Sequence, residues 1–315
     1  MADLTIVAYM TVSARSMIRF AVPGALIVAA ALLLLFQREP QVGYQLPELD
    51  EVLTTDVQRV VMERGDERVE LVRTGDEWRL QPQGHRADRA QVDRIVREAA
   101  GLELTDLLSA DPTAQTHQRY ELDDSRALVV SLFGGGQVMR QFQVGKRAPT
   151  YGHTYVLLAD DRRVFQAAGD LTSVFQTSAD ALRDLSALSF QADAITAVEA
   201  VTAAGVTRLT RTAGEDQTTT WVDQSGAVAD GEAMEEALRV LSSLRATRFL
   251  EADPVGTPLL ELSLQDPAGV HLLTLYPEQE DAHSATSSGA EDPFVLLPFS
   301  LANVLAAFGL DPAIE

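Results

Sequence analysis

The sequence predicts an α+β protein with two tandem, similar domains, each a mostly antiparallel sheet with helices packed on it, preceded by one transmembrane helix. Three observations predict it: an apolar run near the N-terminus, short Val-, Leu- and Trp-rich segments separated by Gly-Asp turns, and the recurrence of those segments in the same order. Of the 315 residues, 46% are hydrophobic and 23% are charged. This composition is typical of globular proteins, and the length allows two domains with separate cores.

The N-terminal apolar run predicts a membrane anchor at residues 17–38. Phe20–Phe36 contains 17 consecutive uncharged residues, which as a helix would be about 25 Å long. A cleaved signal peptide is the alternative, but no small-x-small cleavage site follows the run, so we expect an uncleaved anchor. Residues 1–16 would then be a cytoplasmic tail, unless the true start is Met17.

The charges beside the run predict its orientation. Arg15 and Arg19 precede it, whereas Arg38, which follows it, is succeeded at once by Glu39. Because positively charged flanks stay in the cytoplasm, we expect a single-pass protein of the bacterial cytoplasmic (inner) membrane with its N-terminus inside. A linker of residues 39–56 and the bulk of the chain would then be periplasmic or extracytoplasmic.

The first repeat is predicted at residues 57–176. It begins with three strand-like runs separated by turns at Gly65-Asp66 and Gly75-Asp76, which predict a three-stranded meander. Asp88 then predicts a helix N-cap, with Gln91 completing a capping box. The apolar residues of this helix recur at helical spacing: Val92, Ile95, Val96 and Ala99. Four further strand-like runs and a short apolar helix complete the repeat.

The second repeat is predicted at residues 195–315, because the same signals recur there in the same order. The cap at Asp88 is 23 residues from Asp111 of an Ala-Asp-Pro sequence, and Asp230 is 23 residues from Asp253 of another. Asp230 likewise predicts an N-cap, and the helix face after it consists of Met234, Ala237, Leu238 and Leu241.

Two segments depart from the repeated pattern. Residues 177–194 lie between the repeats and predict a helical connector capped at Ser178. Residues 276–293 replace a tight hairpin with an acidic, Ser- and Gly-rich stretch, which predicts a mobile loop.

Each repeat has one tryptophan, Trp78 and Trp221, at the end of the third strand of its meander. A strand tryptophan most often packs in the core. The alternative is a cleft-lining or interaction role, in which two equivalent aromatic rings contact a ligand.

The sequence does not group the residues that enzyme chemistry needs. No histidine has another histidine or a carboxylate pair at zinc-ligand spacing, and no G-x-S-x-G elbow occurs. Gly134–Gly136 lacks the lysine and the following helix of a phosphate loop. The chain has no cysteine, which excludes disulfides and thiolate chemistry. We therefore expect no catalytic residues, no metal site, no cofactor and no enzyme activity.

The net charge restricts the partners. The chain has 25 Lys and Arg residues against 46 Asp and Glu residues, which gives a net charge of −21. Such a chain repels the phosphates of nucleic acids and anionic lipid headgroups, so we expect no nucleic-acid partner and contact with the bilayer only through the anchor.

Several motifs resemble the bacterial family called domain of unknown function 4340. They are Trp-Arg-Leu-Gln-Pro from Trp78, the Ala-Asp pair at Asp88, and the runs at residues 119–124, 144–158 and 181–190. The chain departs from the family's Tyr-Gly-Leu-Asp form, because Glu121 replaces the glycine. The resemblance implies a single-pass membrane protein encoded beside ABC-2-type exporters and a gliding-motility-type auxiliary protein.

These observations together predict a membrane-anchored extracytoplasmic accessory or scaffold protein, the partner of an ABC-2-type, gliding-motility-like transporter. One alternative is an extracytoplasmic sensor that binds a ligand or glycan between the domains. A second alternative is an envelope hydrolase that uses carboxylates among the 46 acidic residues.

Overall fold

The computed structural model describes residues 45–150, 152–213, 219–279 and 282–310. Both sheets belong to one compact unit that begins at Asp50. The expected tail (residues 1–16), the expected anchor (residues 17–38) and most of the expected linker lie outside the described residues. Within the described ranges, no helix is long and apolar enough to cross a membrane.

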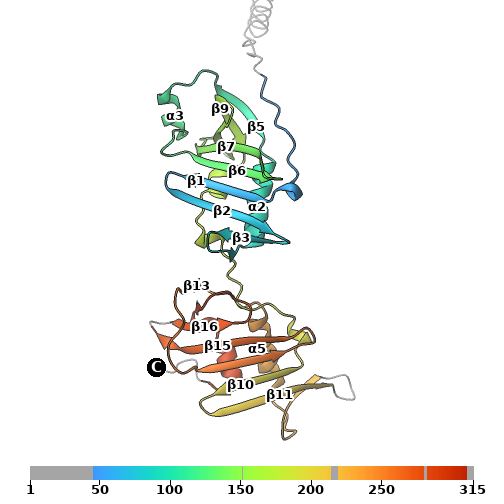
Figure 1. Cartoon of the computed structure of the whole chain (residues 1–315). Helices are drawn as coiled ribbons and strands as arrows, with labels where there is room; N and C mark the ends of the chain where they lie inside the picture. The colour runs from blue at the N-terminus through green and yellow to red at the C-terminus, as the bar shows by residue number, and fades with distance from the viewer. Residues whose placement is uncertain (1–44, 151, 214–218, 280–281, 311–315) are drawn as a thin grey trace, which may run out of the picture. The chain divides into compact units, whose positions relative to one another are not determined.

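The first antiparallel sheet has the strand order β4-β3-β2-β1-β6-β7-β8-β9-β5 (Figure 1). Its strands are β1 (Arg59–Arg64), β2 (Glu67–Thr74), β3 (Glu77–Gln81), β4 (His85–Arg86), β5 (Leu104–Ser109), β6 (Leu128–Gly134), β7 (Gln137–Arg147), β8 (His153–Leu158) and β9 (Asp161–Ala168). The predicted meander is confirmed, because Arg64 pairs with Glu67 and Thr74 pairs with Glu77 across the two expected turns. Gly65 and Gly75 have φ values of 56° and 63°, which explains why glycine occupies both turns.

The helices of the first repeat are α2 (Arg89–Ala100), α3 (Ala114–Tyr120) and α4 (Leu171–Phe175), and a 3-10 turn, η1 (Thr54–Asp56), precedes β1. As predicted, the Asp88 side chain caps α2 by accepting a hydrogen bond from the Gln91 backbone N–H. The Gln91 side chain donates to the Ala181 carbonyl instead, so the expected capping box is only half formed. The four expected apolar residues of α2 are buried against the sheet.

A buried arginine closes the C-terminal end of α2. Arg140 on β7 is 9% exposed, and its guanidinium donates hydrogen bonds to the carbonyls of Ala99, Ala100 and Asp50. Burial lowers the pKa of Arg140 from its usual value. The last carbonyls of a helix lack partners within the helix and carry partial negative charge, so this cation stabilises the helix end.

The second antiparallel sheet has the strand order β12-β11-β10-β14-β15-β16-β17-β13. Its strands are β10 (Ala197–Thr202), β11 (Gly205–Ala213), β12 (Thr219–Asp223), β13 (Arg248–Phe249), β14 (Leu260–Gln265), β15 (Val270–Gln279), β16 (Ala282–Ser287) and β17 (Phe294–Leu296). Apart from β4, this order repeats that of the first sheet strand for strand. The two antiparallel sheets with a few helices confirm the α+β prediction, whereas the exact domain boundaries stay a prediction.

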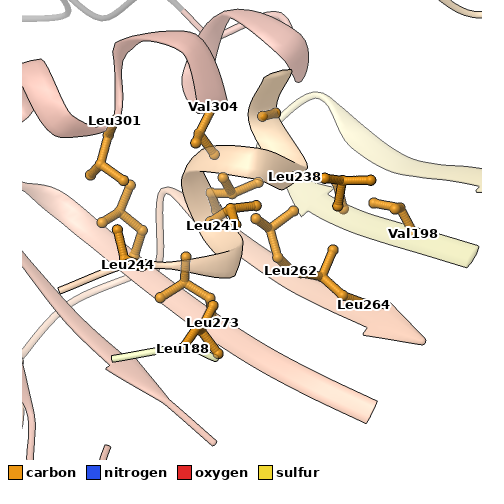
Figure 2. Close-up of a cluster of buried hydrophobic side chains, with 14 of the residues drawn as sticks. Leu188, Val198, Leu238, Leu241, Leu244, Leu262, Leu264, Leu273, Leu301 and Val304 are labelled. Atoms are coloured by element: carbon orange, nitrogen blue, oxygen red, sulfur yellow. The ribbon is translucent and has the colours of Figure 1, made fainter. Parts of the chain in front are cut away.

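The second core lies between this sheet and two helices, α5 (Gly231–Ser242) and α6 (Ala302–Ala307). Asp230 caps α5 as expected, and the four predicted apolar residues of α5 are buried. Figure 2 shows leucine and valine side chains from both helices packed over those of the strands. The interior has the close packing that a stable domain requires.

The connector prediction is wrong, because residues 177–194 do not form a helix. They contain only two 3-10 turns, Asp180–Leu182 (η2) and Ala192–Ala194 (η3). The backbone of this segment bonds to other elements: the Leu182 carbonyl accepts from Asp88, and the Ala187 N–H donates to the Leu244 carbonyl. These backbone groups are therefore not available for bonds within a helix.

The loop prediction for residues 276–293 is also wrong in large part. Residues 282–287 form β16, which pairs with β15 on one side and β17 on the other. The side chains of His283 and Ala285 are buried and their neighbours are not, which is the alternation of a strand. The small polar residues obscured this alternation in the sequence.

Candidate binding site

The two tryptophans occupy equivalent corners of the two repeats. Trp78 pairs with Arg73 between β3 and β2, and Trp221 pairs with Arg211 between β12 and β11. The Trp78 carbonyl accepts a hydrogen bond of 2.9 Å from the Ala87 backbone N–H. The Trp221 carbonyl accepts the equivalent bond of 2.8 Å from the Ala229 backbone N–H. These contacts define the tryptophan corner of each repeat: the tryptophan, its cross-strand arginine and the N-terminal half of the neighbouring helix.

Both tryptophans lie in the core. Trp78 is 5% exposed and Trp221 is 1% exposed. The rings nevertheless line pockets at the protein surface, so a contact between either ring edge and a ligand stays a prediction. The structure does not bring the two tryptophans to one shared site, since each lines a different pocket.

In the second repeat, Glu235 of α5 joins the tryptophan to the arginine. Its carboxylate accepts a 3.0 Å hydrogen bond from the Trp221 indole Nε1 and another from Arg211. Arg211 also donates to the Asp193 carbonyl of the preceding 3-10 turn, and its guanidinium lies 5.2 Å from the centre of the Trp221 ring. One guanidinium nitrogen of Arg211 and the Trp221 indole N–H are therefore both bonded to a side chain of the protein itself.

The electrostatic state of Glu235 reflects these bonds. Burial raises the pKa of its carboxyl group, but the hydrogen bonds from Arg211 and Trp221 outweigh burial and hold the pKa below its usual value. The carboxylate is thus charged at neutral pH and forms charge-assisted hydrogen bonds.

The equivalent acidic residue of the first repeat makes different contacts. Asp93 and Glu235 each lie five residues after the N-cap aspartate of their helix. Asp93 is exposed and forms a 3.6 Å ion pair with Arg89 on the same helix. Arg73 donates a hydrogen bond of 3.4 Å to the Thr55 carbonyl of η1. In the same way, Arg211 donates to the Asp193 carbonyl of η3. In the described part of the chain, no carboxylate lies within ion-pair distance of Arg73.

A pocket of about 280 Å³ lies at this first corner. Its charged lining residues are three arginines and two aspartates: Arg73, Arg89, Arg97, Asp76 and Asp93. Trp78, Thr54 and Thr55 also line it. A second pocket of about 730 Å³ shares Thr55 and Arg73 and adds Arg59, with no acidic lining residue. The two linings together have four arginines and two aspartates, on a chain whose net charge is −21; of the arginines, Arg59 is paired with Glu70 and Arg89 with Asp93.

The pocket beside Trp221 has the opposite charge. It measures about 860 Å³, and its charged lining residues are four acids and one arginine: Asp230, Glu232, Glu235, Glu236 and Arg239. The two corners therefore share a backbone arrangement but differ in the ligand charge that they favour.

The sequence predicted, as one alternative, a ligand cleft between the repeats. Polar contacts join the repeats there, beside a pocket of about 380 Å³ lined by Trp78, Asp184 and Arg245 among others. Arg183 donates a 2.6 Å hydrogen bond to Asp292, and the Arg86 backbone N–H donates a 3.0 Å bond to Glu291. His85 lies 3.2 Å from the same Asp292 carboxylate. These groups serve as partners for one another, which gives this contact a structural role.

The carboxyl groups of the described residues have lowered pKa values wherever a shift occurs. For Asp123, whose pKa is lowered to about 2, the causes are hydrogen bonds from Arg126 and Ser125. In the described ranges, no group of three or more His, Asp or Glu residues has the arrangement of a metal site. Lowered pKa values at ion pairs and turns are those of stabilised carboxylates.

Sequence reasoning missed the corner residues Arg73, Asp93, Arg211 and Glu235. A signal for them was present, because each acid follows its helix cap by the same number of residues. The pairing of each arginine with a tryptophan depends on strand register, which residue spacing along the chain does not specify.

Residues 78–261 match the family described as Domain of unknown function (DUF4340). No curated protein and no solved structure matches the chain significantly. The family match covers more than half of the chain and includes Trp78, α2 and the whole second tryptophan corner, whereas Arg73 lies before it. The chain therefore belongs to the DUF4340 family.

Proposed function

We propose that the protein is a membrane-anchored, extracytoplasmic accessory or scaffold protein that works by binding to the subunits of an ABC-2-type, gliding-motility-like transporter. The apolar run at residues 17–38 supports the anchor, and its flanking arginines support the orientation. One such run offers a tether and no translocation path. The sequence has no nucleotide-binding motif, so the energy of transport would come from another subunit.

The observation that carries the binding role is the arrangement of the second sheet. Its helices α5 and α6 pack on one face, as α5 does behind the strands in Figure 1, and the opposite face is open to solvent. In the second sheet, that face exposes Val206, Val270 and Leu272, each about half exposed, among polar side chains. Mixed surfaces of this kind suit recognition of another protein.

The assignment is tested by a pulldown of the full chain in mild detergent, followed by mass spectrometry. We expect transporter subunits to copurify with the full chain. A chain that lacks residues 1–40 shows which part makes the contact: retention of the subunits places it on the two repeats, and loss places it on the anchor. Repeated absence of transporter subunits, although they are expressed, would refute the partner assignment.

The proposed topology has a separate test. Reporter fusions after Pro40 and at the C-terminus should be active only with reporters that function outside the cytoplasm. Activity of a cytoplasm-only reporter at the C-terminus, or a mature protein that begins near Gln37, would refute the anchored topology.

A further inference from the structure

We propose that the tryptophan corner of the first repeat is a carboxylate-binding pocket that receives an acidic side chain of a partner protein, at the position that Glu235 fills in the second repeat. The proposal rests on the proposed function in one respect: it assumes that the ligand is a side chain of a partner protein. The pocket itself is assigned from the contacts of the two corners.

The first step is the equivalence of the donors. Arg73 and Arg211 each pair with the tryptophan of their corner, and each donates to the carbonyl of the middle residue of a 3-10 turn. Their backbone N–H groups also make equivalent bonds, Arg73 to the Gln58 carbonyl at 2.8 Å and Arg211 to the Thr196 carbonyl at 2.9 Å. The two arginines are therefore equivalent in strand register, in their backbone bond and in the turn to which each side chain donates.

The second step is the difference in the acceptor. In the second repeat, the Glu235 carboxylate accepts from the arginine and from the indole N–H together. Asp93 is shorter by one methylene, which reduces its reach by about 1.5 Å. It pairs with Arg89 at the surface, and among the described residues neither Arg73 nor the Trp78 indole forms a hydrogen bond to a carboxylate. The donors that hold a carboxylate in one corner lack one in the other.

The third step is the space and the charge around these donors. The pocket of about 280 Å³ is lined by Trp78, Arg73 and Asp93 together, which places an entering group beside the donors. The adjoining pocket of about 730 Å³ gives room to the residues that flank the bound carboxylate, while its Arg59 forms an ion pair of 3.6 Å with Glu70. Arginine and an indole N–H are both suitable donors to a carboxylate.

The nature of the ligand follows from charge. A polyanion such as a nucleic acid or an anionic membrane would experience the net charge of −21 over its whole length. A single acidic side chain on a partner enters only the cationic corner. Glu235 shows that the arrangement accepts a carboxylate of ordinary side-chain geometry.

The experiment titrates the full chain in non-ionic detergent with a blocked tetraglutamate peptide, and uses the matching tetraglutamine peptide as control. The chain has two tryptophans, so ¹⁵N-labelled indole gives two N–H signals, and Trp78→Phe identifies which belongs to Trp78. We expect the tetraglutamate peptide to shift the Trp78 signal with a weak affinity, a Kd of about 1 mM. The Trp221 signal should not move.

Three variants test the geometry. Asp93→Glu reproduces the acceptor of the second repeat and should weaken peptide binding about tenfold, because the protein's own carboxylate fills the pocket. Arg73→Gln should weaken binding to a similar extent by removing the charge. Glu235→Asp is the matched control: it makes the reverse change in the other corner and should leave the Trp78 titration unchanged. Circular dichroism of each variant verifies folding.

Several results would overturn the proposal. These are an unmoved Trp78 signal, an equal response to tetraglutamine, and full binding by Arg73→Gln. An equal or stronger response to inorganic phosphate would replace the carboxylate site with a general anion site. If the Trp78 signal shifts with protein concentration in the absence of peptide, the ligand of the pocket is a second copy of the chain. A failed titration would leave the transporter pulldown valid, so the two proposals fail separately.

Discussion

Truncation of the two equivalent helix acids should have very different effects on stability. Glu235→Ala removes an acceptor from Arg211, whose side chain is 12% exposed, and from the buried Trp221 indole. Hydrogen bonds to charged groups contribute about 1.5–3 kcal/mol each, and a donor left unpaired costs about 1–3 kcal/mol. Because the Glu235 side chain is 37% exposed, solvent screening keeps the total near the lower end, at about 2–3 kcal/mol.

Asp93→Ala provides the matched comparison. It removes a 3.6 Å ion pair whose side chains are 73% and 48% exposed, and such helix pairs contribute about 0.3–0.5 kcal/mol. Alanine has a higher helix propensity than aspartate, which offsets part of this loss. We therefore expect the free energy of unfolding to change by less than about 0.5 kcal/mol.

Urea unfolding of both variants, followed by circular dichroism, measures the difference. For an m-value of about 2–3 kcal/mol/M, the midpoint should fall by about 1 M for Glu235→Ala and remain nearly unchanged for Asp93→Ala. Equal midpoint shifts would refute the claim that only the second corner is internally bonded.

The same comparison has a pH dependence. The folded-state pKa of Glu235 lies below its ordinary value of 4.5, so its stabilisation is fully present above about pH 4.5 and is lost as the pH falls through the folded pKa. The difference between the wild type and Glu235→Ala should therefore shrink below pH 4.5. A difference that stays constant down to pH 3 would refute the charged-acceptor account.

Four further predictions concern single residues, the first three to be checked by urea unfolding. Glu121→Gly should stabilise the protein by about 0.5–1 kcal/mol, because Glu121 has a φ of 57°, where glycine is not strained. Arg140→Met should cost about 1–3 kcal/mol by removing hydrogen bonds to the end of α2. Trp78→Ala should cost about 3–5 kcal/mol, since the ring is buried. In carbon NMR, the Asp123 carboxyl should titrate near pH 2; a midpoint near its ordinary 3.8 would contradict the bonding by Arg126 and Ser125.

The sequence predicted those elements whose burial has a simple period. The meander was readable from two Gly-Asp turns, and α2 and α5 from an aspartate cap followed by buried residues at helical spacing. Both signals are local, and the structure uses the same residues for packing that produce the pattern. The recurrence of the pattern then predicted a second sheet like the first.

Other elements were missed because they lack such a period. Helix α3 has no buried residue, and a Thr113 and Thr116 capping box holds its N-terminus. The connector bonds to both repeats through its backbone, which no side-chain pattern encodes. Glu121 was noticed only as a departure from the family's glycine. The structure explains why a glycine suits this position, because Glu121 ends α3 in the left-handed conformation that glycine adopts without strain.

The candidate pocket could not be predicted from the sequence, for a different reason. Trp78 and Trp221 were identified as equivalent, but their environments depend on residues that are distant along the chain: Arg73 on another strand and Asp93 on the helix. A difference of one methylene between aspartate and glutamate has no effect on hydropathy or charge. It acquires meaning only when strand register places both acids beside equivalent arginines.

The two repeats therefore serve as an internal comparison. Packing residues are shared between the corners, as expected where the fold alone constrains them: the tryptophan, the cross-strand arginine and the capped helix all recur. The acceptor and the surrounding charge differ, with four acids lining the second pocket and two aspartates among three arginines lining the first. A glutamate at position 93 could bond to the arginine and the indole of the first corner as Glu235 does in the second. Folding alone therefore does not require aspartate at this position, and we expect a binding requirement to act on Asp93.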